Sequence, residues 1–230
     1  MSFTYLLINI FIIAVPLWYT FDERTVYYRR LPALGFSIAV VSGIYLIWDI
    51  FVTARGEWSF NGRYLTGVQV FNLPLEEVLF FVTVPYSCLF IYEVVLYATR
   101  SSSFKLPNLV IGTAVVVLLA AGVLFHDHGY TSKALTSCGL FLITALLLDR
   151  PLLDSKQYWG WLAICYVPFL IVNWVLTALP VVEYNPRAIF GVRIFSIPVE
   201  DFFYNYSMLS FYILFYRMRN KSRTDPTVRS

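Results

Sequence analysis

Two short acidic motifs are the residues of this sequence best suited to chemistry. Glu76-Glu77 and Glu200-Asp201 each follow a proline and begin a long apolar segment. Proline suits the first turn of a helix, and an acid there gains about 0.3–1 kcal/mol from the helix dipole. That effect needs only one acid, whereas each motif carries two. Because carboxylates close to hydrocarbon are costly and usually face a functional interior, the pairs favour a catalytic role.

Acid–base catalysis is the chemistry that such pairs can perform. Burial and a neighbouring like charge both disfavour the ionised form of a carboxyl group. One carboxyl of each pair is therefore expected to keep its proton and act as a general acid, while the other serves as a base or an orienting partner.

The residues one turn further along differ between the two motifs. Phe80 and Phe81 follow the first pair, and Tyr204 and Asn205 follow the second. Aromatic faces stabilise a cation and offer it no nucleophile. Phe80, Phe81 and Tyr204 are therefore candidates for cation stabilisation or substrate binding, and Asn205 is a secondary catalytic candidate.

Membrane-spanning helices must position these residues. The chain is 59% hydrophobic and 13% charged, with a mean hydropathy of +0.68, whereas a soluble domain is about 25% charged. About 20 apolar residues cross a bilayer. Because the first segment lacks the basic start and cleavage site of a signal peptide, it is counted as a helix. We predict an all-α, polytopic bundle of about seven helices, at residues 3–20, 31–53, 78–98, 109–125, 134–148, 158–179 and 202–216.

An internal repeat relates the two motifs. Residues 45–77 match residues 169–201 without gaps at an offset of 124, and the matches include polar residues that apolar helices do not share by chance. We predict a three-helix unit (1–100), a linker helix (101–126), a second three-helix unit (127–219) and a basic cytoplasmic tail (220–230). Such parallel repeats place both acid pairs at equal depth around one cavity. The matched pairs include Asn61/Asn185, Arg63/Arg187, Pro74/Pro198 and Glu76/Glu200.

Two further acids lie inside the apolar segments. Asp49 is matched by Asn173 in the repeat, so a polar group is kept there and a charge is not. A structural hydrogen bond between helices explains this as well as catalysis does. Glu93 lies near the far end of its segment, where it can reach the membrane interface. Asp49 and Glu93 remain secondary catalytic candidates.

Basic residues predict the orientation in the cell membrane. Five Lys and Arg residues fall on the side of the acid pairs and twelve on the other. The positive-inside rule then places the N-terminus outside and the C-terminus in the cytoplasm. Membrane anchoring explains the net charge of +3, so no nucleic acid is expected as a partner.

Several cofactor classes lack their signatures. No dinucleotide motif occurs, so we expect no cofactor. Cys88, Cys138 and Cys165 all fall in apolar segments and are expected in the core, as neither disulfides nor metal ligands. His126 and His128 lie in one short loop, a pattern more typical of a solvent-exposed turn than of a metal site. No lysine falls within a predicted helix, which excludes a retinal Schiff base.

Three segments together resemble the lycopene cyclase domain family: residues 45–67, the PLEEVLFF segment ending in FIYE, and residues 185–205. The resemblance is to the membrane-embedded type found as paired small bacterial subunits and in the fungal bifunctional enzyme, with both halves fused here. It implies a lycopene β-cyclase of carotenoid biosynthesis, a redox-neutral isomerase. A carboxylic acid protonates the terminal double bond of a linear end group, the neighbouring alkene captures the cation, and a base removes a proton.

By position in the family motifs, Glu76, Glu77, Glu200 and Asp201 are the catalytic acids. We predict that Glu76 and Glu200 are the more important pair, because they are identical across the repeat. The implied partners are lycopene and membrane lipid. Association between copies, or with other carotenoid enzymes, is left open.

Alternatives remain within and outside this class. A cyclase of C50 carotenoids is not excluded by the sequence. A small-solute transporter shares the arrangement of three, one and three helices, but its proline–glutamine signature is missing and the repeated element here is acidic.

Overall fold

The fold was analysed in a computed structural model that describes residues 3–224, with side chains to residue 220. Of the predicted tail at 220–230, residues 220–224 continue the last helix, and residues 225–230 lie outside the described residues. Short 3-10 helices span Tyr19–Phe21, Tyr27–Arg30 and Gly62–Tyr64. The α-helices are α1 (Thr4–Trp18), α2 (Leu31–Ala54), α3 (Leu75–Ala98), α4 (Asn108–Leu124), α5 (Gly129–Leu148), α6 (Arg150–Asp154), α7 (Lys156–Ala178) and α8 (Val199–Thr224). The strands are β1 (Trp58–Phe60), β2 (Gln69–Val70), β3 (Leu73–Pro74), β4 (Val182–Tyr184), β5 (Arg193–Ile194) and β6 (Ile197–Pro198).

The predicted all-α membrane bundle is confirmed. Within the described residues, α1, α2, α3, α5 and α7 are long and apolar enough to span a membrane, two of them together with their flanking 3-10 turns. Helix α4 is equally apolar but has 17 residues. Helix α8 has 26 residues and carries acids at its start and bases at its end. The prediction of seven spans stays a prediction.

Helices α3 and α8 begin three residues earlier than the hydropathy pattern predicts. The apolar segments start at Val78 and Phe202, whereas the helices start at Leu75 and Val199. The carboxyl groups lower the local hydropathy, but the preceding prolines, Pro74 and Pro198, start the helix regardless. Both acid pairs consequently lie in the first helical turn.

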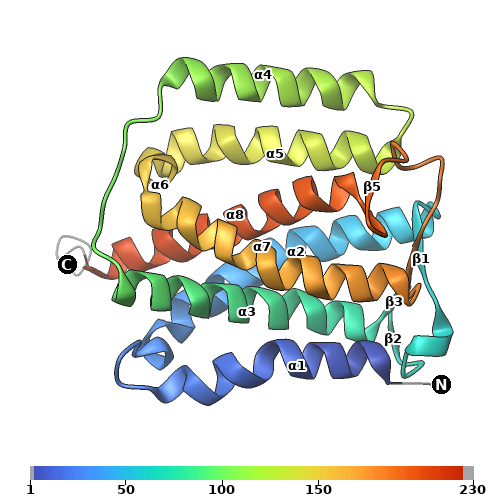
Figure 1. Ribbon diagram of the computed structural model, residues 1–230, viewed down its shortest axis with the longest axis horizontal. Helices are drawn as coiled ribbons and strands as arrows, with labels where there is room; N and C mark the ends of the chain where they lie inside the picture. Colours follow the sequence, from blue (N-terminus) through green and yellow to red (C-terminus); the bar gives the residue numbers. More distant parts are fainter. Residues whose placement is uncertain (1–2, 225–230) are drawn as a thin grey trace.

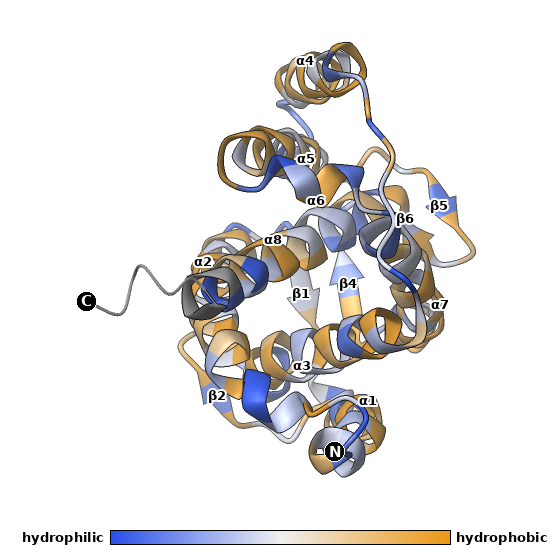
Figure 2. Cartoon of the chain, turned by 90° about the vertical axis from the view of Figure 1, so that its left-hand side faces the viewer, coloured by the Kyte–Doolittle hydropathy of each residue, from blue (hydrophilic) through white to orange (hydrophobic). Residues whose placement is uncertain are grey.

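Four helices surround the centre of the bundle. Viewed down the long axis, α2, α3, α7 and α8 form a ring, with α1 outside α3 and with α5 and α4 outside α8 (Figure 2). The strands gather at the end where α1 begins, and α8 ends at the opposite end (Figure 1). Because α3 and α8 both start beside the strands, both acid pairs lie at this strand end.

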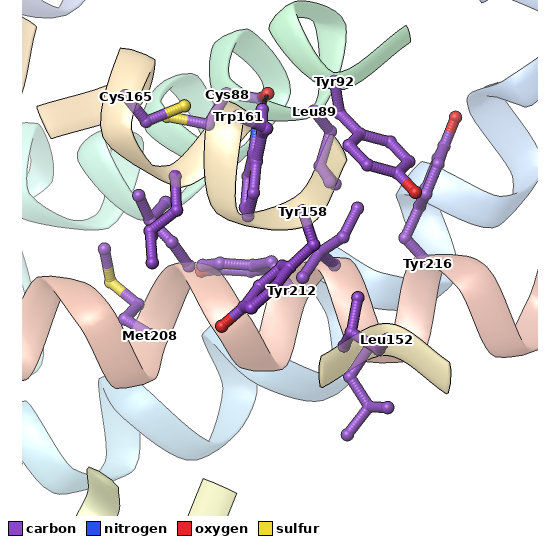
Figure 3. Close-up of a cluster of buried hydrophobic side chains, with 14 of the residues drawn as sticks. Cys88, Leu89, Tyr92, Leu152, Tyr158, Trp161, Cys165, Met208, Tyr212 and Tyr216 are labelled. Atoms are coloured by element: carbon purple, nitrogen blue, oxygen red, sulfur yellow. Dashed lines mark hydrogen bonds between the residues drawn. The ribbon is translucent and has the colours of Figure 1, made fainter. Parts of the chain in front are cut away.

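A core of aromatic and sulfur-containing residues fills the rest of the bundle (Figure 3). Trp161 of α7 donates its indole N–H to the carbonyl oxygen of Cys88 on α3, at 2.6 Å, and its ring packs edge-on against Tyr92. Cys88, Cys138 and Cys165 are buried and free. These contacts bind the two predicted repeat units to each other.

At the strand end, residues related by the offset of 124 make equivalent backbone contacts. Strand β1 pairs antiparallel with β4, Trp58 opposite Tyr184 and Phe60 opposite Val182, so the pairing maps onto itself when the copies are exchanged. The N–H of Asn61 bonds the carbonyl oxygen of Val181, and that of Asn185 bonds Glu57. The two copies thus meet through a pseudo-two-fold strand pair.

Each copy then forms the same small hairpin before its acid pair. Strands β2 and β3 pair in the first copy, and β5 and β6 in the second. The turn residues Phe71 and Phe195 occupy the left-handed region, at φ 57° and 56°, which bulky residues rarely adopt. Gly67 and Gly191 have φ of 88° and 91°. This shared strain supports a duplication of the loop, while the division into three, one and three helices remains a prediction.

Candidate active site

The first acid of each pair closes its loop onto its helix. Oε1 of Glu76 accepts the N–H of Thr66 at 2.6 Å, and Oε1 of Glu200 accepts the equivalent N–H of Phe190 at 2.6 Å. Thr131 of α5 adds its hydroxyl to Glu200. Glu76 and Glu200 are 0% and 1% exposed, and Oε2 of each has no hydrogen-bond partner among the described residues. Each glutamate therefore combines a structural oxygen with a buried, unpartnered one.

Glu77 lies against a second carboxyl group. Tyr5 of α1 donates to Oε2 of Glu77 at 2.5 Å, and Asp49 of α2 is close enough to interact with it electrostatically. Oδ1 of Asp49 accepts the indole N–H of Trp58 at 2.8 Å and the hydroxyl of Thr53 at 3.2 Å. Oδ2 of Asp49 is buried without a partner among the described residues. Two carboxyl groups that interact in this way disfavour each other's ionised form.

Asp201 is held by three donors instead. Tyr130 of α5 donates to Oδ1 at 2.6 Å, and Tyr184 of β4 donates to Oδ2 at 2.8 Å. Asn173 of α7 donates to Oδ2 at 2.9 Å, in the position that Asp49 occupies in the first copy. A carboxylate surrounded by donors is stabilised as an anion. The two half-sites, one around Glu77 and one around Asp201, are thus equivalent in position and different in chemistry.

Tyr184 links the half-sites. Burial raises the pKa of the Tyr184 phenol well above its usual value, and the neighbouring Asp201 and Glu77 add to this effect. The phenol therefore remains neutral and available as a donor. Because Tyr184 interacts electrostatically with the carboxyl groups of both Asp201 and Glu77, the two half-sites form one cluster rather than two separate sites.

Aromatic rings wall this cluster. The ring of Trp58 packs edge-on against Tyr130 at 5.0 Å, and Tyr130 stacks on Tyr184 at 5.7 Å. The predicted residue Tyr204 lies 5.1 Å from Trp48 and 6.1 Å from Tyr130, ring centre to ring centre. Such walls stabilise a cation while excluding water.

The other predicted aromatic residues lie close to the first half-site. Phe80 packs against Tyr5 with a ring separation of 5.9 Å. Phe81 lies one helical turn from Glu77 and is buried in the main core. Asn205 is buried one turn beyond Asp201 and interacts with Tyr166 of α7.

Glu93 is the predicted site residue that the structure does not bring to the cluster. It lies 16 residues after Glu77 on α3, about 24 Å along the helix. Tyr216 donates to its Oε1 at 2.5 Å, and Arg30 lies 3.8 Å from its Oε2. A catalytic role for Glu93 stays a prediction, but its surroundings are those of an ion pair at the opposite end of the bundle.

The loop histidines and Lys133 lie at the margin. The side chains of His126 and Asp127 are mostly exposed, and among the described residues no cluster of three or more His, Cys, Asp or Glu side chains could hold a metal. Lys133 and Lys156, which the sequence placed outside the helices, lie near the starts of α5 and α7, and Lys133 forms an ion pair with Glu57. The hydropathy pattern missed the first turn of α5 because it is polar.

Tyr5, Tyr130 and Tyr184 are site residues that sequence reasoning missed. Tyr5 and Tyr130 each hold the second acid of a pair, and they are 125 residues apart. Their separation is one residue longer than the repeat offset of 124, so the ungapped alignment did not pair them. Allowing one gap in the repeat was the signal that could have found them.

Comparison with known proteins places this arrangement in a family. Residues 2–95 and 127–218 match the family model described as lycopene cyclase. The chain belongs to the lycopene cyclase family. Both acid pairs and both halves of the aromatic cluster lie within the matched residues, and α4 lies outside them.

The name of one curated relative also includes lycopene cyclase. The bifunctional lycopene cyclase/phytoene synthase of Phycomyces blakesleeanus is 48% identical over 58 residues, which cover 24% of this chain and 10% of that protein. The match thus spans a small part of the relative. No solved structure matches this chain. The chain is thus a member of the lycopene cyclase family whose helices are long and apolar enough to span a membrane.

Proposed function

We propose that this protein is a lycopene β-cyclase that closes β-rings on the linear ends of lycopene by acid catalysis. One observation carries the proposal: Glu77 and Asp201, the second acids of the two pairs, both interact with Tyr184 of one aromatic cluster in a chain of the lycopene cyclase family. A protonatable acid, a cation-tolerant wall and a water-poor interior are what the reaction needs.

The reaction balances without an oxidant or a reductant. A carboxyl proton adds to the terminal double bond of the linear end group and leaves a tertiary carbocation. The neighbouring double bond attacks this cation, which forms the ring bond and moves the positive charge into the ring. Loss of a ring proton to a carboxylate restores a double bond. The product is an isomer of the substrate and the number of protons on the protein is unchanged, so a proton must pass from the accepting carboxyl group to the donating one before the next ring is closed.

The described contacts support a division of labour. Glu76, Glu200 and Asp49 each offer a buried carboxyl oxygen without a hydrogen-bond partner among the described residues, which leaves that oxygen free to deliver a proton to the substrate. The three donors to Asp201 offset part of the cost of burying its anion, which suits proton acceptance or orientation. Trp58, Tyr184 and Tyr204 supply aromatic faces for the cation.

The protein is proposed to lie in the plasma membrane with its strand end outward. Basic residues are concentrated at the opposite end of the bundle, which the positive-inside rule assigns to the cytoplasm. The acid cluster would then lie in the outer half of the bilayer.

Expression in cells that accumulate lycopene tests the function. Chromatography of the pigments is expected to show products with one or two β-rings and less lycopene. Unchanged lycopene alongside a folded, membrane-inserted protein would contradict the proposal. Conversion of C50 carotenoids alone would shift the assignment to the alternative cyclase.

A further inference from the structure

The two half-sites differ in how they meet the lipid. A cavity of about 320 Å³ lies between α1 and α7, at the strand end of the bundle. Ile8 and Phe11 of α1 and Val172 and Val175 of α7 belong to its apolar lining. Phe11 is 77% exposed at its outer edge, so the cavity is a groove that opens sideways onto the position of the bilayer.

This α1–α7 groove leads to the first half-site. Ile8, Val172 and Phe80 pack against the buried cluster that contains Tyr5. The ring of Phe80 contacts that of Tyr5, and the hydroxyl of Tyr5 donates to Glu77. A molecule that slides inward along the groove therefore meets the residues that position an acid of the candidate active site.

The internal repeat shows that the corresponding place in the second half is filled. Val172 matches Trp48 at the offset of 124, and Phe80 matches Tyr204. Trp48 and Tyr204 pack against each other at 5.1 Å, and Tyr45 packs against both. The small side chain of Val172 thus leaves space between α1 and α7, whereas the indole ring of Trp48 fills the matching space beside the second half-site.

We infer that the end group of the carotenoid enters from the lipid through the α1–α7 groove to the Glu77 half-site, and that Val172 keeps this route open. The inference rests on the proposed function. Since an engineered cavity of 150 Å³ accommodates benzene, the groove takes roughly twelve carbon atoms, an isoprenoid end group rather than the whole polyene. The rest of the chain would remain in the bilayer.

A larger apolar cavity of about 460 Å³, between α4, α5, α7 and α8, is a poorer route. Its lining on α8 includes Phe202 and Tyr206, which lie about 100–160° around the helix from Asp201 and Tyr204. Helix α4, which forms one wall, lies outside the residues that match the family model. This cavity therefore serves as a control.

Tryptophan substitutions inside and outside the groove test this route. The quantity measured is the amount of lycopene converted, normalised to the amount of folded protein. Val172→Trp is expected to lower conversion at least tenfold by blocking the groove. Val167→Trp places the same ring on an exposed position of α7 outside the groove, and Ala114→Trp fills the larger cavity. Both are expected to remain within about twofold of the unmodified protein.

A second variant separates blockage from damage to the half-site. Ile171→Trp narrows the outer edge of the groove, where the side chain is 57% exposed, and is also expected to lower conversion. Full conversion by folded Val172→Trp and Ile171→Trp proteins overturns the inference, as does equal loss in Val167→Trp or a loss confined to Ala114→Trp. If the unmodified protein leaves lycopene unchanged, the proposed function itself fails.

Discussion

At the residue scale, each acid pair divides between structure and chemistry. Glu76 and Glu200 tie a loop N–H to the helix start through one oxygen and leave the other without a partner. A glutamine keeps an acceptor for the loop N–H and has no acidic proton, so amide variants separate the two roles.

Glu76→Gln and Glu200→Gln are each expected to lower lycopene conversion by about 10²-fold or more, since general acid catalysis contributes roughly 10²–10⁴-fold. Pigment chromatography normalised to folded protein measures the effect. Undiminished conversion by both variants removes these two residues from the proton-transfer step and leaves it to Glu77 with Asp49.

Tyr130→Phe tests the positioning of Asp201. Tyr130 is the donor to Oδ1 of Asp201 at 2.6 Å, and a hydrogen bond to a charged group contributes about 1.5–3 kcal/mol. We expect a loss of stability of this size, seen as a lower unfolding temperature in detergent, together with slower conversion. An unchanged unfolding temperature would show that Asp201 does not depend on this donor.

The acids could be recognised from sequence because they are repeated, while their partners could not. Glu76 and Glu200 match in type and register, but Tyr5 donates to Glu77 across 72 residues and Tyr184 reaches both half-sites only through the β1–β4 pair. Tertiary packing determines such contacts, and periodicity carries no information about them.

At the element scale, charged side chains gather near helix starts and ends. The acid pairs occupy the first turns of α3 and α8, and a second polar group lies at the other end of the bundle. There Arg217 of α8 donates to buried Asp149 at 2.8 Å and to Tyr92 at 3.0 Å.

Asp149→Ala is expected to destabilise the bundle by about 3–5 kcal/mol, because it leaves the partly buried Arg217 without its ion-pair partner. Thermal unfolding in detergent measures the change. Asp127→Ala, at a side chain 86% exposed, is the control and is expected to change stability by less than about 0.5 kcal/mol. Equal effects of both substitutions would argue against a structural role for the Asp149–Arg217 pair.

The helices themselves were predictable because hydropathy reports membrane burial directly. The structure contains a helix in each of the seven predicted apolar segments. The missed turns are the polar first turns of α3, α5 and α8, where Glu76, Lys133 and Glu200 interrupt the apolar pattern. Hydropathy is weakest at helix starts that carry polar side chains, and here those starts form the candidate site.

At the scale of the whole molecule, one end carries the acid cluster and the other carries most of the positive charge. The pseudo-two-fold strand pair closes the first end and brings the half-sites together. The asymmetry of Trp48 and Val172 then leaves one half-site accessible from the side. Duplication followed by divergence explains how a near-symmetric bundle acquires one entrance.

Cysteine labelling in intact cells tests the orientation. Gly62→Cys lies in an exposed loop at the strand end, where an added Cβ meets no atom within 4 Å, and Ser101→Cys lies at the opposite end. A membrane-impermeant maleimide is expected to label Gly62→Cys alone, since the native cysteines are buried. Labelling of Ser101→Cys alone would reverse the assignment.

Isotope incorporation tests the central claim most directly, which is that carboxyl groups in exchange with water protonate the polyene. Lycopene is converted by the protein in deuterated buffer, and the products are analysed by mass spectrometry. The account predicts one deuterium retained for each ring closed, at the carbon that receives the proton, and no change in oxidation state. Rings formed without deuterium, or with gain or loss of hydrogen, would contradict it.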